Sequence, residues 1–418
     1  MSCTAQTSNP GHGDAPGAAA SAGSPSGPGA LGSGGSSAVG SGGTSAVGTG
    51  LAPNCNNVNP GPSLVRRLNR FEYNNTVRDL LGDTTAPANT FPEESKTKLG
   101  LDNNASSLTV SPVLIEQYEL AAENLASAAI AKMSTLLGCD PIAAGEEACG
   151  KSFISSFGQK AFRRPLAADE SARLWSVLDA GRQSQDFATG VSMVIQTILQ
   201  SPAFLYRVEF GSPPTNGQVA VRLTSWEMAT RLSYLVWQSM PDDQLTQAAQ
   251  QDALTKDDAI AAQVTRMLAD PRARTMVAHF HDMWLHLQRF NTLEKDPTVF
   301  PKFSPEIAGL MSQETHQFLD HLVWDGEGDV TTMFTAPYTY LNAKLASYYG
   351  LTAPGDTFSK VAVDPSLRLG LLSQGGLLAT MDKQNQTGPV QRGKFIREQL
   401  LCMEMPPPPP NVPKAPDL

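Results

Sequence analysis

Helix-start signals followed by apolar residues at helical spacing constrain the fold of this chain more than any other feature. Asn69 is suited to cap a helix, and Glu72, three residues later, completes a capping box in its looser form. A similar phrase recurs at Arg222, where Thr224 and Glu227 have the spacing of a full capping box. Two explanations stay open for this recurrence: a distant duplication, or the same helix-start chemistry used twice.

Helical periodicity continues through most of the chain, whereas strand patterns are scarce. Predicted helices with apolar residues at helical spacing lie at 112–133, 153–162, 191–210 (broken at Pro202), 226–290 (three or four helices), 307–324 and 341–349. Only two short runs, 219–223 and 360–363, have the composition of strands. The sequence therefore predicts an all-α fold, a multi-helix, bundle-like body of about a dozen or more helices.

Composition divides the chain into a tether, a helical body and a proline-rich tail. From Thr4 to about Pro53 the residues are almost all Gly, Ser, Ala and Pro with one acidic residue, Asp14, and such a segment cannot bury a core. We predict a disordered tether at 1–60 and a tail at 406–418 that begins with five consecutive prolines, a composition typical of a polyproline II rod. Between them we expect helical segments at 61–138, 150–212, 219–350 and 351–405.

Charge and hydropathy argue against two classes of partner. The formal net charge of −9 disfavours nucleic acid, because phosphate contacts need clustered lysine and arginine. No apolar run approaches the roughly 18–20 residues of a membrane span, and the best candidate, 191–199, is followed at once by Ser201 and Pro202. We therefore expect no nucleic acid partner and no membrane-spanning segment.

The five cysteines favour an exported protein over a cytosolic metal site. Cys139 and Cys149 flank a loop between two helical patterns, and a disulfide between them would stabilise the protein by about 3 kcal/mol on loop-closure grounds. No C-x-x-C occurs in the 418 residues, which excludes a zinc knuckle, a thioredoxin motif and a covalent haem site within them.

Cys3 has the surroundings of a lipid anchor. It follows a small residue and precedes the tether, as the lipidated cysteine of a bacterial lipoprotein does, although the apolar signal segment that should precede it is missing. The alternative is a chance cysteine near a disordered start. We expect an exported protein of the periplasm or cell surface that meets a membrane only through this anchor.

A metal site is the sharpest hypothesis for the clustered histidines. His279 and His281 point about 200° apart around a helix, and His279 and His286 share a face but lie about 10 Å apart, so no two of them form a site alone. A site would require His279 or His286 to meet His316, Glu314 or Asp320 across a pair of helices. The competing interpretation is solvated or capping histidines in a packed bundle.

Motifs of well-known enzyme classes are missing from the sequence. It contains no G-x-S-x-G elbow, no G-x-G-x-x-G and no phosphate-binding G-x-x-x-x-G-K-[ST] loop. Catalytic residues therefore stay unassigned, and the sequence leaves open whether the chain is an enzyme. Five aromatic residues lie at core-type helical positions, and we predict that they pack in the core instead of forming a sugar-stacking platform: Trp226, Tyr234, Trp237, Trp284 and Trp324.

A series of phrases in a constant order resembles one protein family. They are RRLNRFEYNNTVRDLLG, LDNNASSLTVS, FRRPLAADE, LQSPAFLYRVEFG, LTSWEMATRLSYLVWQSMPDDQL, LNAKLASYYGL, RLGLLSQGGLLAT and the PPPPPNVP tail. Together they resemble the successive domains of unknown function that planctomycetes and myxobacteria carry beside planctomycete-type cytochrome c modules. The likeness covers about 62–413 and supplies no catalytic residues.

The resemblance implies a redox setting without a haem in this chain. In the family, the proline-rich segment is typically followed by a module with a C-x-x-C-H haem-attachment motif, so haem c is expected in a downstream module and a cytochrome c module or other redox partner as the associate. Cys402 would then pair with that module or with Cys55. We expect the haem-free part of a protein of electron transfer or oxidation; the alternative is a non-enzymatic extracellular binding or scaffold module.

Overall fold

The computed structural model describes residues 63–97, 99–212, 221–326, 328–352 and 355–405. The predicted tether, Cys3, Cys55 and the predicted polyproline tail lie outside these residues. Within them the chain forms seventeen α-helices and only four short strands, so the all-α prediction is confirmed. No helix of this described part is long and apolar enough to span a membrane.

The first group of helices shares one hydrophobic core. Its elements are α1 (Arg70–Leu81), α2 (Pro112–Ile130), α3 (Met133–Leu137), α4 (Pro141–Ala144), α5 (Glu146–Phe162), α6 (Ala168–Ser184), α7 (Phe187–Leu199) and α8 (Pro202–Leu205). Two short strands, β1 (Arg66–Arg67) and β2 (Tyr206–Arg207), pair antiparallel beside them. The core includes the fully buried Tyr73, Phe153 and Phe204, which come from α1, α5 and α8.

The strand β2 departs from the predicted helical run over 191–210. Pro202 begins the four-residue helix α8, and the chain then becomes extended at Tyr206 because it pairs with Arg67 of β1. Leu68 strengthens this pairing, since its backbone N–H donates to the carbonyl of Leu205 at 2.8 Å. A pairing of segments so distant in sequence is invisible to local periodicity.

Four helices and a second core follow. They are α9 (Ser225–Val236), α10 (Asp243–Gln250), α11 (Asp257–Leu268) and α12 (Pro271–Trp284). Their core gathers around Trp237, which is 1% exposed and donates its indole N–H to the carbonyl of Met267. The guanidinium of Arg272 lies 3.5 Å from the centre of the same indole, which adds a cation–π contact between α9 and α12.

A third core holds the C-terminal elements together. They are α13 (Pro305–Trp324), α14 (Val330–Thr335), β3 (Tyr338–Leu341), α15 (Ala343–Tyr349), β4 (Ser359–Ala362), α16 (Gly375–Met381) and α17 (Pro389–Phe395), which continues as a π-helical turn, Ile396–Leu400. The strands β3 and β4 pair antiparallel, with Tyr338 opposite Ala362, so the predicted strand at 360–363 is present within one residue. Short 3₁₀ turns complete the fold at Pro87–Thr90, Ala105–Ser107, Ala253–Thr255, Leu287–Thr292 and Leu371–Ser373.

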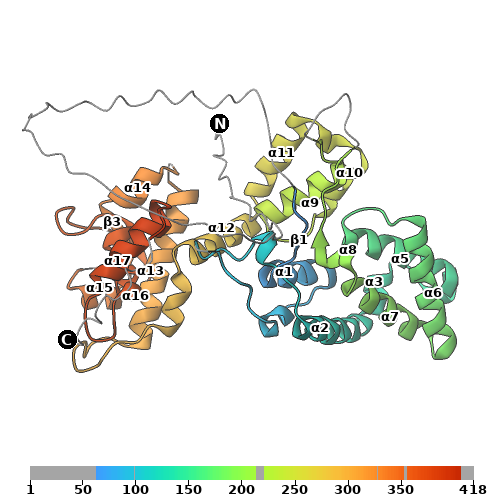
Figure 1. The fold of residues 1–418 in the computed structure, drawn as a ribbon, viewed down its shortest axis with the longest axis horizontal. Helices are drawn as coiled ribbons and strands as arrows, with labels where there is room; N and C mark the ends of the chain where they lie inside the picture. The colour runs from blue at the N-terminus through green and yellow to red at the C-terminus, as the bar shows by residue number, and fades with distance from the viewer. Residues whose placement is uncertain (1–62, 98, 213–220, 327, 353–354, 406–418) are drawn as a thin grey trace, which may run out of the picture. The chain divides into compact units, whose positions relative to one another are not determined.

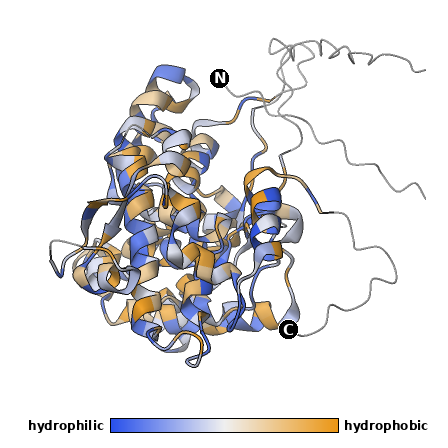
Figure 2. Ribbon diagram, turned by 90° about the vertical axis from the view of Figure 1, so that its left-hand side faces the viewer, coloured by the Kyte–Doolittle hydropathy of each residue, from blue (hydrophilic) through white to orange (hydrophobic). Residues whose placement is uncertain are grey.

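The predicted helix-start chemistry is present at both sites. The Asn69 side chain accepts a hydrogen bond from the N–H of Glu72, whose carboxylate accepts from the N–H of Asn69. Thr224 and Glu227 make the same reciprocal pair at the start of α9. Figure 2 shows hydrophobic and hydrophilic residues alternating along the helices, as expected for helices that each bury one stripe.

Candidate functional site

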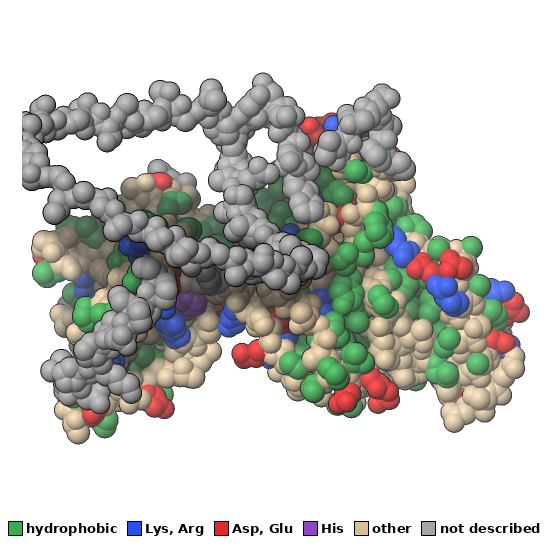
Figure 3. Space-filling view, viewed as in Figure 1, with side chains coloured by type: hydrophobic (Ala, Val, Ile, Leu, Met, Phe, Trp, Pro, Cys, Tyr) green, Lys and Arg blue, Asp and Glu red, His purple; other side chains and the backbone are tan. Residues whose placement is uncertain are grey.

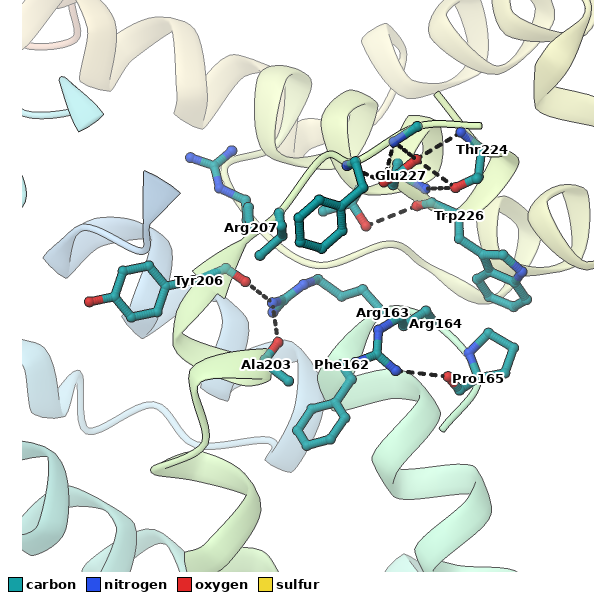
Figure 4. Close-up of a pocket in the computed structure, with 14 residues that line it drawn as sticks. Phe162, Arg163, Arg164, Pro165, Ala203, Tyr206, Arg207, Thr224, Trp226 and Glu227 are labelled. Atoms are coloured by element: carbon teal, nitrogen blue, oxygen red, sulfur yellow. Dashed lines mark hydrogen bonds between the residues drawn. The ribbon is translucent and has the colours of Figure 1, made fainter. Parts of the chain in front are cut away.

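A cavity of about 540 Å³ lies where three segments of the chain meet (Figure 4). The end of α5 and the following turn, Phe162 to Pro165, form one wall. The segment that leaves β2 forms the second wall, and the first turns of α9, with Trp226 and Glu227, form the third. A volume of this size is typical of pockets that hold small organic molecules.

Arg163 is the most deeply buried charge of this cavity. It ends α5 in the left-handed region, with φ 59°, which turns its side chain back across the cavity wall. The Nη2 group donates to the carbonyls of Ala203, Phe204 and Tyr206 at 2.9 Å each. Arg163 is 5% exposed, and no carboxylate pairs with it in the described part of the chain. Burial therefore lowers the pKa of its guanidinium.

The other two arginines of the cavity have carboxylate partners. Arg164 makes a two-pronged pair with Glu170, with N–O distances of 2.8 and 2.9 Å, and this hydrogen bonding lowers the pKa of Glu170 to about 2. Arg207 donates to the buried Glu72 at 2.8 Å. Burial raises the pKa of Glu72, and the positive charge of Arg207 opposes that rise.

Glu227 is the only acidic residue among the described residues that line the cavity. Its oxygens accept from the N–H groups of Phe210, Gly211 and Thr224, at 2.7 to 3.0 Å for the closest contact of each, and from the Thr224 hydroxyl. Burial acts to raise the pKa of Glu227, but these hydrogen bonds outweigh it and hold the pKa below the usual range. Because its acceptor positions are occupied, Glu227 organises the wall and is poorly placed to act as a base.

Apolar residues and three hydroxyl-bearing ones, Tyr206, Thr224 and Thr230, make up the rest of the cavity lining. Phe162, Pro165, Phe210 and Trp226 are among the lining residues, and the half-buried Trp226 also packs against the core around Trp237, in agreement with the prediction. Trp237, which directly follows α9, is in the core, as predicted. The arrangement is therefore suited to binding a molecule with a flat apolar part.

A second polar site surrounds Glu314 of α13. This carboxyl is fully buried and accepts from the hydroxyls of Thr339 at 2.6 Å and Tyr349 at 2.7 Å. Burial raises the pKa of Glu314 to about 7, although both hydrogen bonds and the charge of Arg368 act to lower it. Two buried donors nearby, Arg368 Nη1 and Gln374 Nε2, have no hydrogen-bond partner.

The four candidate metal ligands lie in separate hydrogen-bonded arrangements. Glu314 accepts hydrogen bonds from Thr339 and Tyr349, and His279 stacks on Phe71 with ring centres 3.9 Å apart. The Nε2 of His286 lies 3.0 Å from the side-chain amide of Gln399. His316 contacts Asp282 through Nε2 at 2.6 Å, a hydrogen bond that raises its pKa.

These arrangements agree with the packed-bundle interpretation of the histidines. Asp320, the remaining candidate, pairs with Arg274 at 2.8 Å. Over the described ranges, no three histidine, cysteine, aspartate or glutamate side chains are grouped as a metal site requires. His279, His286 and His316 contact Phe71, Gln399 and Asp282 on other elements, partners that their spacing in the sequence does not reveal.

The predicted disulfide between Cys139 and Cys149 is confirmed. Their Cα atoms lie 5.8 Å apart, and the bond joins the end of α3 to α5. Cys402 is exposed and forms no disulfide in the described part of the chain. The expected anchor residue Cys3 and Cys55, the alternative partner of Cys402, lie outside the described residues.

Four family models match successive parts of the chain. "PSD3: Protein of unknown function (DUF1587)" matches residues 66–131, and "PSD5: Protein of unknown function (DUF1595)" matches 149–209. "PSD4: Protein of unknown function (DUF1592)" matches 223–351, and "PSCyt3: Protein of unknown function (DUF1588)" matches 368–418. The chain belongs to the planctomycete cytochrome c-associated family of successive domains of unknown function. No curated protein and no solved structure matches it.

The cavity of this cytochrome c-associated protein combines residues from different family segments. Arg163 and Arg207 belong to segment 149–209, Trp226 and Glu227 to segment 223–351, and the partner of Arg207, Glu72, to segment 66–131. Sequence reasoning missed this site, because no local pattern shows that the segments meet. All five residues lie in the sequence phrases that carry the family resemblance, and these phrases are the signal that could have located the site.

Proposed function

We propose that this chain is the haem-free helical part of an exported c-type-cytochrome-associated protein that works in electron transfer or an oxidative process. The observation that carries the proposal is the ordered match to four cytochrome c-associated segments along the chain. The Cys139–Cys149 disulfide supports export, because such bonds persist in oxidising compartments. The haem would belong to another module or to a partner protein.

The proposal is tested by asking whether the chain meets a c-type cytochrome in its own cell. We expect an antibody to the purified chain to recover a haem-staining protein, either as one polypeptide with this chain or as a complex. Addition of the pure chain to that isolated cytochrome should then change the rate at which its haem is reduced. A gene product without haem, together with no recovered cytochrome, would favour the non-enzymatic binding or scaffold alternative.

Anchoring through Cys3 is part of the same proposal. The small residue before Cys3 and the charge-poor composition after it support lipidation of that cysteine. Metabolic labelling with a fatty-acid analogue, using the natural upstream sequence, should mark the protein and fail in Cys3→Ser. The Cys402→Ser variant is the matched control, because it removes an exposed cysteine without affecting the anchor. Labelling that survives Cys3→Ser would contradict the anchor.

A further inference from the structure

We propose that a small cavity between α13, β3 and the 3₁₀ turn Leu371–Ser373 binds one water molecule as a fixed internal ligand. This inference goes beyond the association with a cytochrome and does not depend on it. It rests on three observations: the size of the cavity, two buried donors in its lining that lack a partner, and a buried carboxylate that can accept further hydrogen bonds.

The size of the cavity fits one water molecule and excludes larger ligands. Its volume is about 10 Å³, which is close to the smallest space that holds a single water. The polar part of its lining includes Glu314, Thr339, Arg368, Ser373 and Gln374. Small cavities hold ordered water where they are polar and stay empty where they are apolar.

Two buried donors in the lining need an acceptor. Gln374 is 3% exposed, and its side-chain oxygen accepts from the Thr315 hydroxyl at 2.8 Å, but its Nε2 group has no hydrogen-bond partner among the described residues. The same holds for the buried Nη1 group of Arg368. The guanidinium of Arg368 lies 4.4 Å from the ring centre of Tyr349, a cation–π contact that restricts its position. Because Arg368 and Gln374 line one water-sized cavity, a single water oxygen can accept from both.

The same lining supplies acceptors for the hydrogens of that water. Each carboxylate oxygen of Glu314 accepts one hydroxyl hydrogen bond, from Thr339 at 2.6 Å and from Tyr349 at 2.7 Å. A carboxylate has about four acceptor positions, so positions on Glu314 remain for a further donor. The Ser373 hydroxyl donates to the carbonyl of Gly370 at 3.0 Å, which leaves its oxygen able to accept. Water fits this lining because it accepts from the donors and donates to the acceptors at once.

The water would bridge parts of the chain that two different family models match. The Glu314 side of the cavity lies in the segment matched at 223–351, and the Arg368 side lies in the segment matched at 368–418. Figure 3 shows charged side chains scattered over the outer surface around α13 to α17, whereas Glu314 is fully buried. An internal water would give these buried groups the hydrogen bonds that bulk solvent gives to the surface charges.

The first test is a crystal structure of the full chain at a resolution that shows ordered water. We expect a density peak within about 3.2 Å of both Arg368 Nη1 and Gln374 Nε2, the upper limit for a hydrogen bond from nitrogen. A cavity without density would overturn the proposal. So would a structure in which the two donors bond to protein oxygens and the cavity is closed.

The second test uses a variant in solution. Magnetic relaxation dispersion of the water oxygen signal counts the internal waters that exchange slowly with bulk solvent. Arg368→Met removes one donor and part of the cavity wall, and we expect one slowly exchanging water fewer than in the wild type. Arg173→Met is the matched control and should leave the number unchanged, because Arg173 lies on α6 in an exposed pair with Asp169 and does not line the cavity. The same number in a folded Arg368→Met as in the wild type would refute the proposal, and if this variant does not fold, the crystallographic test decides.

Discussion

Burial strongly changes the pKa of a single carboxyl group, that of Glu314. Its two hydroxyl partners, Thr339 and Tyr349, satisfy its oxygens, yet the loss of solvent raises its pKa to about 7. The usual pKa of such a group is 4.5. The folded protein therefore binds this proton more tightly than the unfolded chain does.

The pH dependence of stability follows from that difference. A raised folded pKa contributes stability that is fully present below pH 4.5 and is lost as the pH rises towards 7. At about 1.4 kcal/mol per pKa unit, the contribution of Glu314 is about 3 kcal/mol. We expect Glu314→Gln to remove this loss of stability with rising pH, so that the variant gains stability relative to the wild type between pH 5 and pH 8. Urea unfolding at several pH values measures the difference.

The control for this prediction lies on the same helix. Glu306 begins α13 and is exposed, in contrast to Glu314. Glu306→Gln should leave the pH dependence of the wild type unchanged. The prediction fails if Glu314→Gln and the wild type lose stability in parallel between pH 5 and pH 8.

At the scale of elements, α6 and α7 pack unusually closely through two glycines. A Cβ atom on Gly181 would lie 2.7 Å from the Cα of Gly190, and one on Gly190 would collide with the carbonyl oxygen of Leu178. Both obstacles are backbone atoms, which cannot rotate aside as a side chain can. The two helices can therefore approach this closely only because both positions lack a side chain.

Gly190→Ala should consequently destabilise the protein by about 1–3 kcal/mol, the usual cost of overpacking. Gly309 is the matched control, since it is an exposed glycine within α13 with no atom within 4 Å of an added Cβ. Gly309→Ala should stabilise by up to about 1 kcal/mol through helix propensity alone. Denaturant midpoints at constant m-value measure both. Similar midpoints for the two variants would show that the close approach does not constrain the helices.

At the scale of the whole molecule, a buried ion pair joins segments that are far apart in the sequence. Glu72 of α1 accepts from Arg207 of β2 at 2.8 Å, and their side chains are 4% and 13% exposed. The pair thus links the segment matched at 66–131 to the one matched at 149–209. Removing one partner leaves the other charge buried and uncompensated.

We expect Glu72→Gln to destabilise the protein by about 3–5 kcal/mol, the range for breaking a buried pair. Asp169→Asn breaks the exposed pair with Arg173 and should change stability by less than about 1 kcal/mol. Thermal unfolding of both variants beside the wild type makes the comparison. A loss of less than 1 kcal/mol in Glu72→Gln would mean that the pair does not tie the segments together.

The sequence predicted what depends on near neighbours along the chain. The caps at Asn69 and Thr224 and the Cys139–Cys149 bond each span at most ten residues, and all three are confirmed. The cavity could not be predicted in this way, because Arg163 and Trp226 approach only after several helices have packed. The partners of the histidines could not be predicted for the same reason, because residues such as Asp282, which contacts His316, lie on another helix.

The environment of Arg163 also has a consequence for ion dependence. Three carbonyl oxygens converge on its Nη2 group at 2.9 Å, an oxygen-lined arrangement that in other proteins holds a hard metal cation. Here the cation is covalently attached to the chain. It cannot be extracted by a chelator or exchanged for another ion, so the support that it gives to the end of α8 and the start of β2 does not depend on a bound metal.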